Sequence, residues 1–240
     1  MRAMIFAAGL GTRLYPLTID KPKALVEVAD KTLLQMAIEK VSLAGYHDLV
    51  INIHHFGDQI IRFLAKNDNF GQNITISDEC GQLLNTGGGI LKAAPLLDGD
   101  EAFLVYNVDV LSNIDLQLFR KYHLEQGGLV TLAVRDRNTA RYLAFDEAMQ
   151  LTGWRNIKTG DEIASRNMHN CSLLAFSGIQ LIEPAIFKLI TETGSFPLIP
   201  LYLRLAAEHR IMGYQDQSTL WMDLGKPEQI KEAEKMIVKQ

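Results

Sequence analysis

Cysteine and histidine are scarce in this sequence of 240 residues, which has two cysteines and six histidines. Cys80 and Cys171 stand far apart, without the close spacing of zinc ligands, so isolated thiols are favoured over a disulfide or a metal site. The histidines do not show the HxxxH or HExxH spacing of metal-binding motifs. These residues therefore point neither to a zinc centre nor to a Cys/His nucleophile.

Long apolar runs and excess positive charge are also missing. No segment reaches the ~20 apolar residues of a membrane-spanning helix, and the apolar start of the chain, broken at Gly9, is too short for a secretory signal. The 24 Lys and Arg residues are outnumbered by 28 Asp and Glu residues, for a net charge of -4. We therefore expect no nucleic-acid or membrane partner and, by default, a cytoplasmic location. The oligomeric state stays open, a homo-oligomer included.

The first half of the chain alternates strand patterns with helix patterns. Apolar runs predict strands at residues 3–7, 48–53, 74–77, 102–106 and 129–134. Apolar residues at helical spacing predict helices at residues 33–41, 59–65, 90–97 and 116–124. Such alternation predicts an α/β fold with a Rossmann-like, doubly wound, mostly parallel sheet. Ligands of these sheets bind at the carboxyl ends of the strands.

The pattern changes from Arg141 to Phe176. Short apolar pieces predict antiparallel strands at 142–145, 150–154 and 171–176, around a polar loop at 155–169 that borders a second substrate. The remaining elements are helices at 183–192 and 198–208, short strands at 211–214 and 219–222, and a last helix opened by Pro227. We expect a single domain, 1–240, with portions at about 1–135 and 136–225 and a C-terminal helix at 226–240.

A glycine-rich stretch at Ala7–Arg13, Ala-Ala-Gly-Leu-Gly-Thr-Arg, follows the first predicted strand. Glycines let backbone N–H groups approach an anion closely, and Arg13 and Lys23 add positive charge nearby. Leu14 stands where a dinucleotide-binding GxGxxG motif needs its third glycine, and no Gly-Lys-Ser/Thr of a P-loop follows. Two close glycines can mark a tight turn alone, but the combination with the basic residues favours a polyphosphate site.

The stretch from Ala7 to Leu25, AAGLGTRLYPLT followed by KPKAL, resembles the signature of the sugar-1-phosphate nucleotidyltransferases. Ala24 and Glu27 replace two prolines of the usual motif, which changes loop rigidity but no basic group. The resemblance implies that Arg13 and Lys23 are catalytic. It also implies nucleotide binding by five residues of the loop: Ala7, Ala8, Gly9, Gly11 and Thr12.

Two aspartates resemble the metal ligands of that family. Asp109 comes just after a buried strand, where a carboxylate can hold a hard cation or cap a turn. Asp223 lies in the sequence Trp-Met-Asp-Leu-Gly, which resembles the family's late W-x-D-[LIV]-G motif. The resemblance, and not the spacing, implies that Asp109 and Asp223 bind Mg²⁺ together. Val108 stands where relatives usually have glycine.

Two further segments resemble parts of the family that contact the base and the sugar. Leu84–Ile90 carries three glycines before a predicted helix, a composition that is costly unless the backbone passes close to something flat. The resemblance implies that Thr86, Gly87 and Gly88 border the nucleobase. Gln82, just before this segment, can either hydrogen-bond a base edge or lie solvated in a loop. The resemblance also implies sugar contacts from Asn107 and Gly178. In relatives a lysine near position 158 contacts the sugar phosphate, but Lys158 lacks the usual Glu-Lys-Pro context and can equally be an exposed loop lysine.

The resemblance implies an Mg²⁺-dependent enzyme that joins a nucleoside triphosphate to a sugar 1-phosphate and releases pyrophosphate. The segments Thr86–Ile90 and Phe196–Leu201 resemble the uridylyltransferases of N-acetylmuramate 1-phosphate, which favours UTP and such a sugar. Guanylyltransferases of mannose or heptose 1-phosphate stay open, as does a non-catalytic regulatory subunit that binds nucleotide sugar. A dehydrogenase is disfavoured, because Leu14 replaces the third glycine and histidines follow the second strand.

Overall fold

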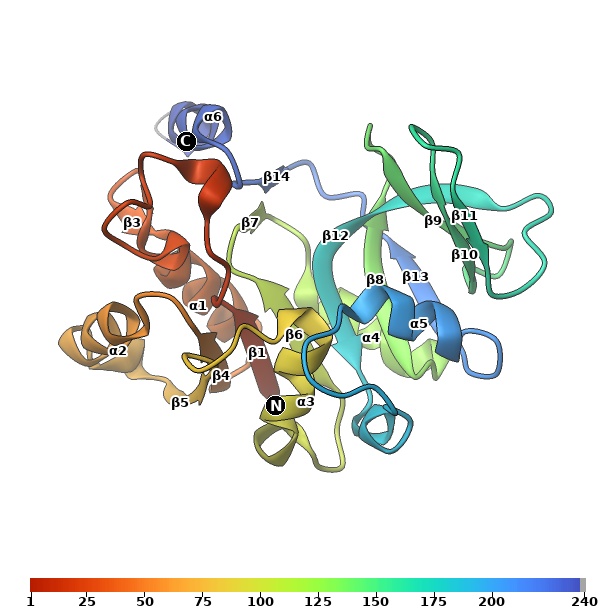
Figure 1. Ribbon diagram of the computed structural model, residues 1–240, viewed down its shortest axis with the longest axis horizontal. Coiled ribbons are helices and arrows are strands. Elements are labelled where there is room, and N and C mark those ends of the chain that lie inside the picture. Colours follow the sequence, from red (N-terminus) through yellow and green to blue (C-terminus); the bar gives the residue numbers. More distant parts are fainter. Residues whose placement is uncertain (238–240) are drawn as a thin grey trace.

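The computed structural model describes residues 1–237, and its centre is a sheet of ten strands (Figure 1). Eight strands follow the order β11-β10-β9-β12-β6-β1-β4-β5, while β8 pairs with β12 and with β13. Helices cover both faces of this sheet, so the predicted α/β class is confirmed. No helix in the described part of the chain is long and apolar enough to cross a membrane.

Four parallel strands form the first half of the sheet. In spatial order they are β5 (Asn73–Asp78), β4 (Asp48–Ile53), β1 (Arg2–Phe6) and β6 (Phe103–Asn107). The connections are α1 (Leu33–Leu43), α2 (Gly57–Lys66) and α3 (Asn85–Leu97). The side chains of β1, β4 and β6 are mostly buried, as in a parallel sheet covered on both faces. The carboxyl ends of these strands therefore meet at one edge.

β12 (Ser172–Ile182) joins this half to an antiparallel portion, and it runs antiparallel to β6. Its register shifts between Phe176 and Gln180, where Gly178 has φ +78°, a backbone conformation suited to glycine. The antiparallel strands of this portion are β8 (Val130–Arg135), β9 (Arg141–Phe145), β10 (Leu151–Asn156) and β11 (Glu162–Ala164), while β13 (Ile211–Gln215) runs parallel to β8. The predicted small antiparallel portion is therefore present, and one sheet continues through both portions.

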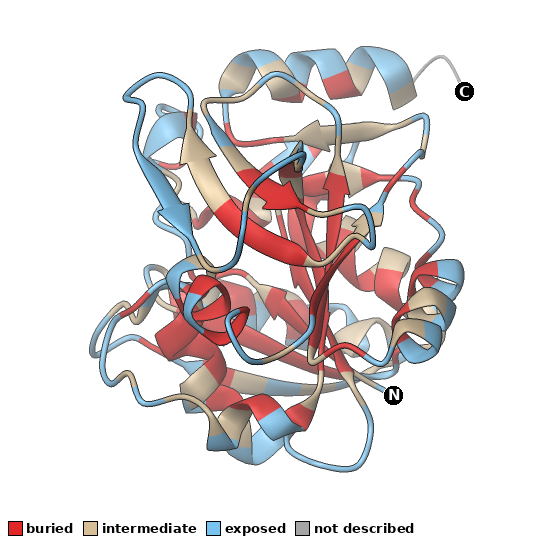
Figure 2. Cartoon of the chain, turned by 90° about the vertical axis from the view of Figure 1, so that its right-hand side faces the viewer, coloured by how far each residue is buried: buried red, intermediate tan, exposed pale blue. Residues whose placement is uncertain are grey.

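Two hydrophobic clusters lie on the two faces of the sheet, because successive side chains of a strand point to opposite sides. Ile5 of β1 joins one cluster with α1, α2, α4 (Leu116–Gln126) and α6 (Pro227–Ile237). Met4 joins the other with α3 and α5 (Leu198–Leu205). Figure 2 shows the buried strands between helices whose outer faces are exposed. The strand ends are thereby held rigidly at the edge that carries the site.

A short ribbon that the sequence analysis did not predict lies beyond this edge. β7 (Val110–Ser112) pairs antiparallel with β14 (Trp221–Asp223). The Leu224 N–H also donates to the Asp109 carbonyl over 2.7 Å. The ribbon therefore brings the two aspartate segments side by side, although they are far apart in the sequence.

The predicted helix at 183–192 is wrong, because the segment forms only a short 3-10 helix, Pro184–Lys188. The chain then runs along the start of α3. There the Gly87 N–H donates to the Phe196 carbonyl over 2.8 Å, and the Phe196 N–H donates to the Leu84 carbonyl over 3.2 Å. These tertiary hydrogen bonds fix the chain just after the predicted helix, where contacts with α3 and not the local apolar pattern decide the path of the backbone.

Other details of the predicted elements need correction. α3 begins at Asn85, so the three glycines lie inside the helix and not before it. The predicted loop at 155–169 contains β11, which pairs with β10. A ribbon of β2 (Glu27–Val28) and β3 (Lys31–Thr32) was not predicted. The last three residues of the predicted final helix lie outside the described residues, and the division of the domain near residue 135 stays a prediction.

Candidate active site

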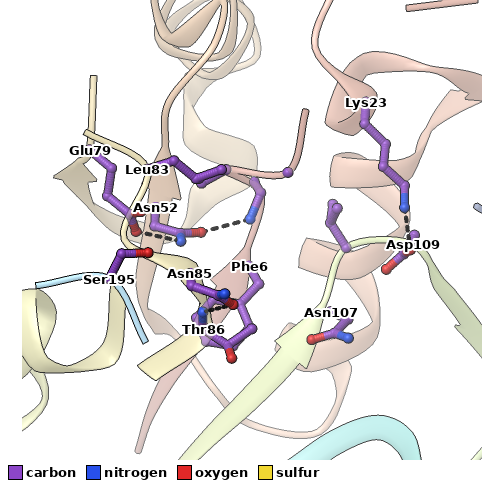
Figure 3. Close-up of a pocket in the computed structure, with 14 residues that line it drawn as sticks. Phe6, Lys23, Asn52, Glu79, Leu83, Asn85, Thr86, Asn107, Asp109 and Ser195 are labelled. Carbon is purple, nitrogen blue, oxygen red and sulfur yellow. Dashed lines mark hydrogen bonds and ion pairs between the residues drawn. The ribbon is translucent and has the colours of Figure 1, made fainter. Parts of the chain in front are cut away.

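A pocket of about 370 Å³ opens at the edge of the sheet where β1, β4 and β6 end. Figure 3 shows the Lys23–Asp109 pair on one side of this pocket and Asn52 and Glu79 on the other. Seven of the predicted site residues line it: Ala7, Ala8, Gly9, Lys23, Thr86, Asn107 and Asp109.

The two glycines of the first loop have different surroundings. Gly11 has φ +67°, and a Cβ there would lie 2.9 Å from the Cβ of Lys23. The Thr18 hydroxyl donates to the Gly11 carbonyl over 2.9 Å, so contacts within the protein already require glycine at this position. A Cβ on Gly9 would meet no atom within 4 Å, although Gly9 lines the pocket. The space at Gly9 is therefore open to a ligand.

Two buried polar residues that the sequence analysis did not single out hold this loop. The Ala7 N–H donates to the Asn52 side-chain oxygen, and the Asn52 amide donates to a Glu79 carboxylate oxygen, both over 2.7 Å. The other Glu79 oxygen accepts from the Leu84 N–H over 3.0 Å. Glu79 is 1% exposed and yet reaches the pocket wall. Asn52 stands within the apolar strand pattern at 48–53, and this could have revealed the contact from the sequence, because a buried amide needs hydrogen-bond partners.

Four charged residues from distant segments converge beside the pocket. Lys23 Nζ forms an ion pair with Asp109 Oδ2. Burial and the neighbouring Asp109 carboxylate raise the pKa of Asp223, whereas Lys23 and Arg13 oppose this shift. A Cβ built on Gly225 would lie 2.7 Å from a carboxylate oxygen of Asp223 and 2.8 Å from a guanidinium nitrogen of Arg13. The structure thus gathers the predicted catalytic and metal-binding residues in one place.

The two carboxylates fit a magnesium ion whose coordination is completed by substrate. Asp223 Oδ1 is buried and has no hydrogen-bond partner within residues 1–237, so it is an acceptor available to a cation. Among those residues, no group of three or more Asp, Glu, His or Cys side chains is placed to hold a metal. Mg²⁺ is commonly bound by one or two carboxylates together with waters and substrate phosphates, and the pair Asp109 and Asp223 matches that pattern.

The glycines of α3 serve close packing within the protein. A Cβ on Gly87 would lie 2.3 Å from the Phe196 ring, and a Cβ on Gly88 would lie 2.2 Å from the Gly194 carbonyl oxygen. These contacts within the protein explain why glycine is needed at both positions, without any contact to a nucleobase. Base contacts by Gly87 and Gly88 therefore stay predictions, while Thr86 lies at the pocket wall as a base-binding residue would.

Other predicted residues lie outside the pocket lining. Thr12 and Arg13 form a short 3-10 helix with Leu14 just beyond the first loop. Gln82 is exposed in the segment before α3, where its backbone N–H donates to the Glu79 carbonyl over 3.0 Å. Lys158 is exposed in the turn between β10 and β11. The roles predicted for Gln82 and Lys158 stay predictions that this geometry does not support.

Asn107 and Gly178, both predicted to contact the sugar, lie next to each other. A Cβ on Gly178 would lie 2.9 Å from the Asn107 side-chain nitrogen, and Asn107 lines the pocket. Phe176, two residues before Gly178, lines a second cavity of about 380 Å³. Apolar side chains of β9, β10, β11 and α5 form most of its wall, and Arg141 supplies a positive charge. This second cavity can therefore hold a ligand group with apolar and anionic parts.

Known proteins share both the sequence and the fold. The chain matches the nucleotidyl transferase family over residues 2–145. It is 34% identical over 234 residues to an N-acetylmuramate alpha-1-phosphate uridylyltransferase of Caulobacter vibrioides, covering 94% of this chain and 92% of that one. It is 29% identical over 230 residues to a probable mannose-1-phosphate guanylyltransferase of Oryza sativa subsp. japonica, covering 95% of this chain and 62% of that one. A solved UDP-glucose pyrophosphorylase complexed with UDP-glucose has a TM-score of 0.79 and 21% identity, over 99% of this chain and 98% of that one.

The chain therefore belongs to the nucleotidyl transferase family. It is an enzyme of the sugar-1-phosphate nucleotidyltransferase class, so the resemblance carried by Ala7–Leu25 is confirmed. The family match ends at residue 145, and the segments of Gly178 and Asp223 are covered by the relatives that span most of the chain. At 21% identity the solved structure shows the shared fold alone.

Proposed function

We propose that this enzyme transfers uridine monophosphate from UTP to N-acetylmuramate 1-phosphate, or to a closely similar sugar 1-phosphate, with Mg²⁺ as cofactor. The observation that carries this proposal is the convergence of Arg13, Lys23, Asp109 and Asp223 beside one pocket. Two cations and two carboxylates together suit the phosphates of two anionic substrates and a divalent cation between them.

The proposed reaction is an in-line displacement at the α-phosphorus of the nucleotide. An oxygen of the sugar phosphate forms the new P–O bond, and the bond to the leaving pyrophosphate breaks with its electron pair. The attacking phosphate is already an anion, so no side chain has to act as a general base. The barrier comes from repulsion between the two anions and from charge that develops on the leaving group. Positioning and electrostatic stabilisation therefore dominate catalysis.

Each of the four charged residues has a task in this proposal. Arg13 binds the leaving β- and γ-phosphates, because a guanidinium can hold phosphate oxygens through two hydrogen bonds. Lys23 stabilises negative charge around the α-phosphate, and its ion pair with Asp109 holds the ammonium group in place. Asp109 and Asp223 would hold Mg²⁺, which would supply positive charge to offset the negative charge of the phosphates.

The Asn52 and Glu79 side of the pocket favours a base with a ring N–H. The two oxygens of Glu79 each accept one hydrogen bond, from Asn52 and from Leu84, and a carboxylate has further lone pairs to offer. Uracil and guanine carry a ring N–H where cytosine and adenine carry an acceptor. UTP and GTP therefore suit this carboxylate better than CTP and ATP, and the 34% identical uridylyltransferase supports UTP.

The second cavity supports a sugar with an apolar and an acidic substituent. N-Acetylmuramate carries an acetyl group and a lactyl ether that ends in a carboxylate. The apolar wall suits the methyl groups, and Arg141 suits the carboxylate. Mannose carries only hydroxyl groups, which an apolar wall leaves without hydrogen-bond partners.

A pyrophosphate-release assay tests the proposal. UTP, GTP, CTP and ATP are each combined with the 1-phosphates of N-acetylmuramate, mannose and glucose, with Mg²⁺ and with EDTA. We expect metal-dependent release with UTP and N-acetylmuramate 1-phosphate, abolished by Asp109→Ala. Faster release with GTP and mannose 1-phosphate would favour the guanylyltransferase alternative, in line with the relative from Oryza sativa. Release with no pair, combined with tight binding of a nucleotide sugar, would favour the regulatory subunit.

A further inference from the structure

Arg137 follows β8 at the edge of the sheet that carries the pocket. β8 is antiparallel to β12, and β12 is antiparallel to β6, so β8 and β6 end at the same edge (Figure 1). The strands lie in the order β4, β1, β6, β12 and β8, and Asp109 follows β6. The glycine-rich first loop follows β1, so it lies on one side of Asp109. Arg137 lies on the other side.

Contacts around Trp221 fix the orientation of the Arg137 guanidinium. Its central carbon lies 4.5 Å from the centroid of the Trp221 ring, and Nη2 donates to the Phe176 carbonyl over 3.1 Å. Trp221 Nε1 donates in turn to the Ser177 carbonyl over 2.9 Å, which fixes the ring. Trp221 and Asp223 are two residues apart on β14, and alternate residues of a strand point to the same face. The guanidinium is therefore anchored next to one of the two carboxylates.

The positive charge of Arg137 is not committed to a partner within the protein. Nε is buried and has no hydrogen-bond partner within residues 1–237, and Arg137 forms no ion pair among them. The neighbouring Arg135, in contrast, pairs with Asp216 at 3.4 Å and donates to the Ser218 carbonyl at 2.9 Å. Burial lowers the pKa of Arg137, while the Asp223 carboxylate opposes this shift. An anionic ligand would satisfy both the charge and the unused donor.

We propose that Arg137 binds the phosphate of the sugar 1-phosphate and aligns it for attack on the α-phosphorus. This inference rests on the proposed function. In-line displacement requires the attacking and leaving groups on opposite sides of the phosphorus. The segment that carries Arg13 follows β1 and Arg137 follows β8, on either side of β6 and Asp109 in the strand order, so the two arginines can hold the leaving and the attacking phosphates separately. Arg137 thereby takes the place that a resemblance in sequence suggested for the exposed Lys158.

Steady-state kinetics of Arg137→Gln and Arg137→Lys test this role with whichever sugar 1-phosphate the wild-type enzyme turns over. We expect Arg137→Gln to raise the KM for the sugar 1-phosphate roughly 10- to 100-fold, the value of a charged hydrogen bond, with the KM for the nucleotide unchanged. Arg137→Lys keeps the charge and should recover part of the affinity. Arg204→Gln, an exposed arginine of α5 paired with Glu192 at 2.8 Å, is the matched control and should change neither constant.

Two kinetic outcomes would overturn the assignment. One is an unchanged KM for the sugar 1-phosphate in Arg137→Gln. The other is an equal rise in KM for both substrates with a lowered melting temperature, which is the signature of a structural role on Trp221. Arg137→Lys keeps the test valid where Arg137→Gln folds poorly, because lysine retains both the apolar methylene stem and the positive charge.

A binding measurement without turnover distinguishes failure of this inference from failure of the proposed function. The chain has two tryptophans, so in a Trp154→Phe background the emission of Trp221 reports on the stacked guanidinium. Inorganic phosphate, titrated with EDTA present, should change this emission saturably, and Arg137→Gln should abolish the change. Equal phosphate binding in both proteins would refute the role of Arg137. Binding that depends on Arg137, without turnover of any sugar 1-phosphate, would support the phosphate site and refute the proposed transfer.

Discussion

At the scale of single residues, the candidate site contains charges that folding alone would not favour. Asp109 is paired with Lys23, whereas Asp223 is half-buried beside it with an oxygen that no described residue satisfies. Burial and the Asp109 charge raise the pKa of Asp223, so its ionised form is disfavoured in the folded protein. Active sites commonly keep such groups at a cost in stability.

We expect Asp223→Asn to separate activity from stability. The substitution removes a proposed metal ligand and should lower kcat by about 100-fold or more, the typical cost of losing one preorganised electrostatic group. It also removes repulsion with Asp109, so the melting temperature should stay unchanged or rise. Turnover assays and thermal melts of the same preparations measure both quantities. Asp109→Asn breaks the ion pair with Lys23 and should lose stability as well as activity. A clear fall in the melting temperature of Asp223→Asn would contradict this view.

Gly9 offers a second prediction at this scale. A Cβ at this position meets no atom within 4 Å, and its φ is not positive, so Gly9→Ala should leave stability unchanged or raise it by up to ~1 kcal/mol. The added methyl group projects into space that we assign to the nucleotide. Overpacking costs ~1–3 kcal/mol, so UTP should bind about tenfold more weakly. Calorimetric titration with UTP and urea unfolding measure the two effects. Unchanged UTP affinity would mean that the nucleotide does not approach this backbone.

At the scale of elements, contacts between segments decide where the site residues lie. The segment 194–196 packs against the first turns of α3 so closely that only glycine fits at two positions. Ser195 of this segment lines the pocket, and Phe196 is hydrogen-bonded to Gly87. The position of the pocket wall formed by α3 therefore depends on a loop that is more than a hundred residues away along the chain.

Gly88→Ala should destabilise the protein. The new methyl group would lie 2.2 Å from the Gly194 carbonyl oxygen, a backbone atom that cannot rotate away. We expect a loss of ~1–3 kcal/mol in the free energy of unfolding, measured by urea titration. Gly81→Ala is the matched control, because a Cβ at Gly81 meets nothing within 4 Å and the position lies just before the same helix. Equal stability of the two variants would show that the contact relaxes without cost.

His123 of α4 links this helix to the sheet and makes the contact sensitive to pH. One ring nitrogen lies 2.7 Å from the Thr131 hydroxyl of β8, and the other lies 3.1 Å from the Glu183 carboxylate. Burial is the largest cause of a lowered pKa at His123; Arg120 lowers it further, and Glu183 opposes the shift. The unfolded chain therefore binds more protons than the folded one in the window below the ordinary histidine pKa of about 6.5.

The free energy of unfolding should consequently fall as the pH drops below about 6.5 and level off above it. His123→Gln should show a flatter profile over this window, because glutamine does not titrate. Urea unfolding of both proteins at several pH values between 5 and 8 measures the difference. Parallel profiles would show that protonation of His123 does not contribute.

At the scale of the whole molecule, the pocket joins segments from most of the chain. Its lining runs from Phe6 to Ser195, and the charges beside it extend to Asp223. A ligand that fills this pocket contacts the loops after several strands at once, and binding to the folded state alone shifts the unfolding equilibrium. Ligand binding should therefore stabilise the entire domain.

UTP with Mg²⁺ at 100 times its Kd should add ~2.7 kcal/mol of stability, a rise of roughly 5–10 °C in melting temperature for a chain of this size. CTP and ATP should give smaller shifts, because their bases place an acceptor opposite Glu79. EDTA should remove most of the UTP effect, since the proposed Mg²⁺ would no longer offset the repulsion between the phosphates and the carboxylates of Asp109 and Asp223. Thermal melts with each nucleotide, with and without EDTA, measure the order. Equal shifts for UTP, CTP and ATP would refute base recognition by Glu79.

The sequence by itself determined which main elements form and which residue types carry the chemistry. Helix and strand patterns depend on neighbours along the chain, so β1, β4, β6 and the helices between them were predictable from apolar spacing. The basic and glycine-rich stretch at 7–25 and the two aspartates were recognisable as residues in a fixed order. The structure gathers Arg13, Lys23 and both aspartates in one place, while their catalytic and metal-binding roles stay predictions.

Only the tertiary structure decided how these parts combine. The β7–β14 ribbon, the non-helical run after Lys188, the Asn52–Glu79 contact and the stack of Arg137 on Trp221 all join residues distant in sequence. Their stability comes from burial and from hydrogen bonds between segments, which no local pattern contains. Gln82 and Lys158 stood in the expected stretches and yet lie outside the pocket lining, because the path of the backbone places their side chains in solvent.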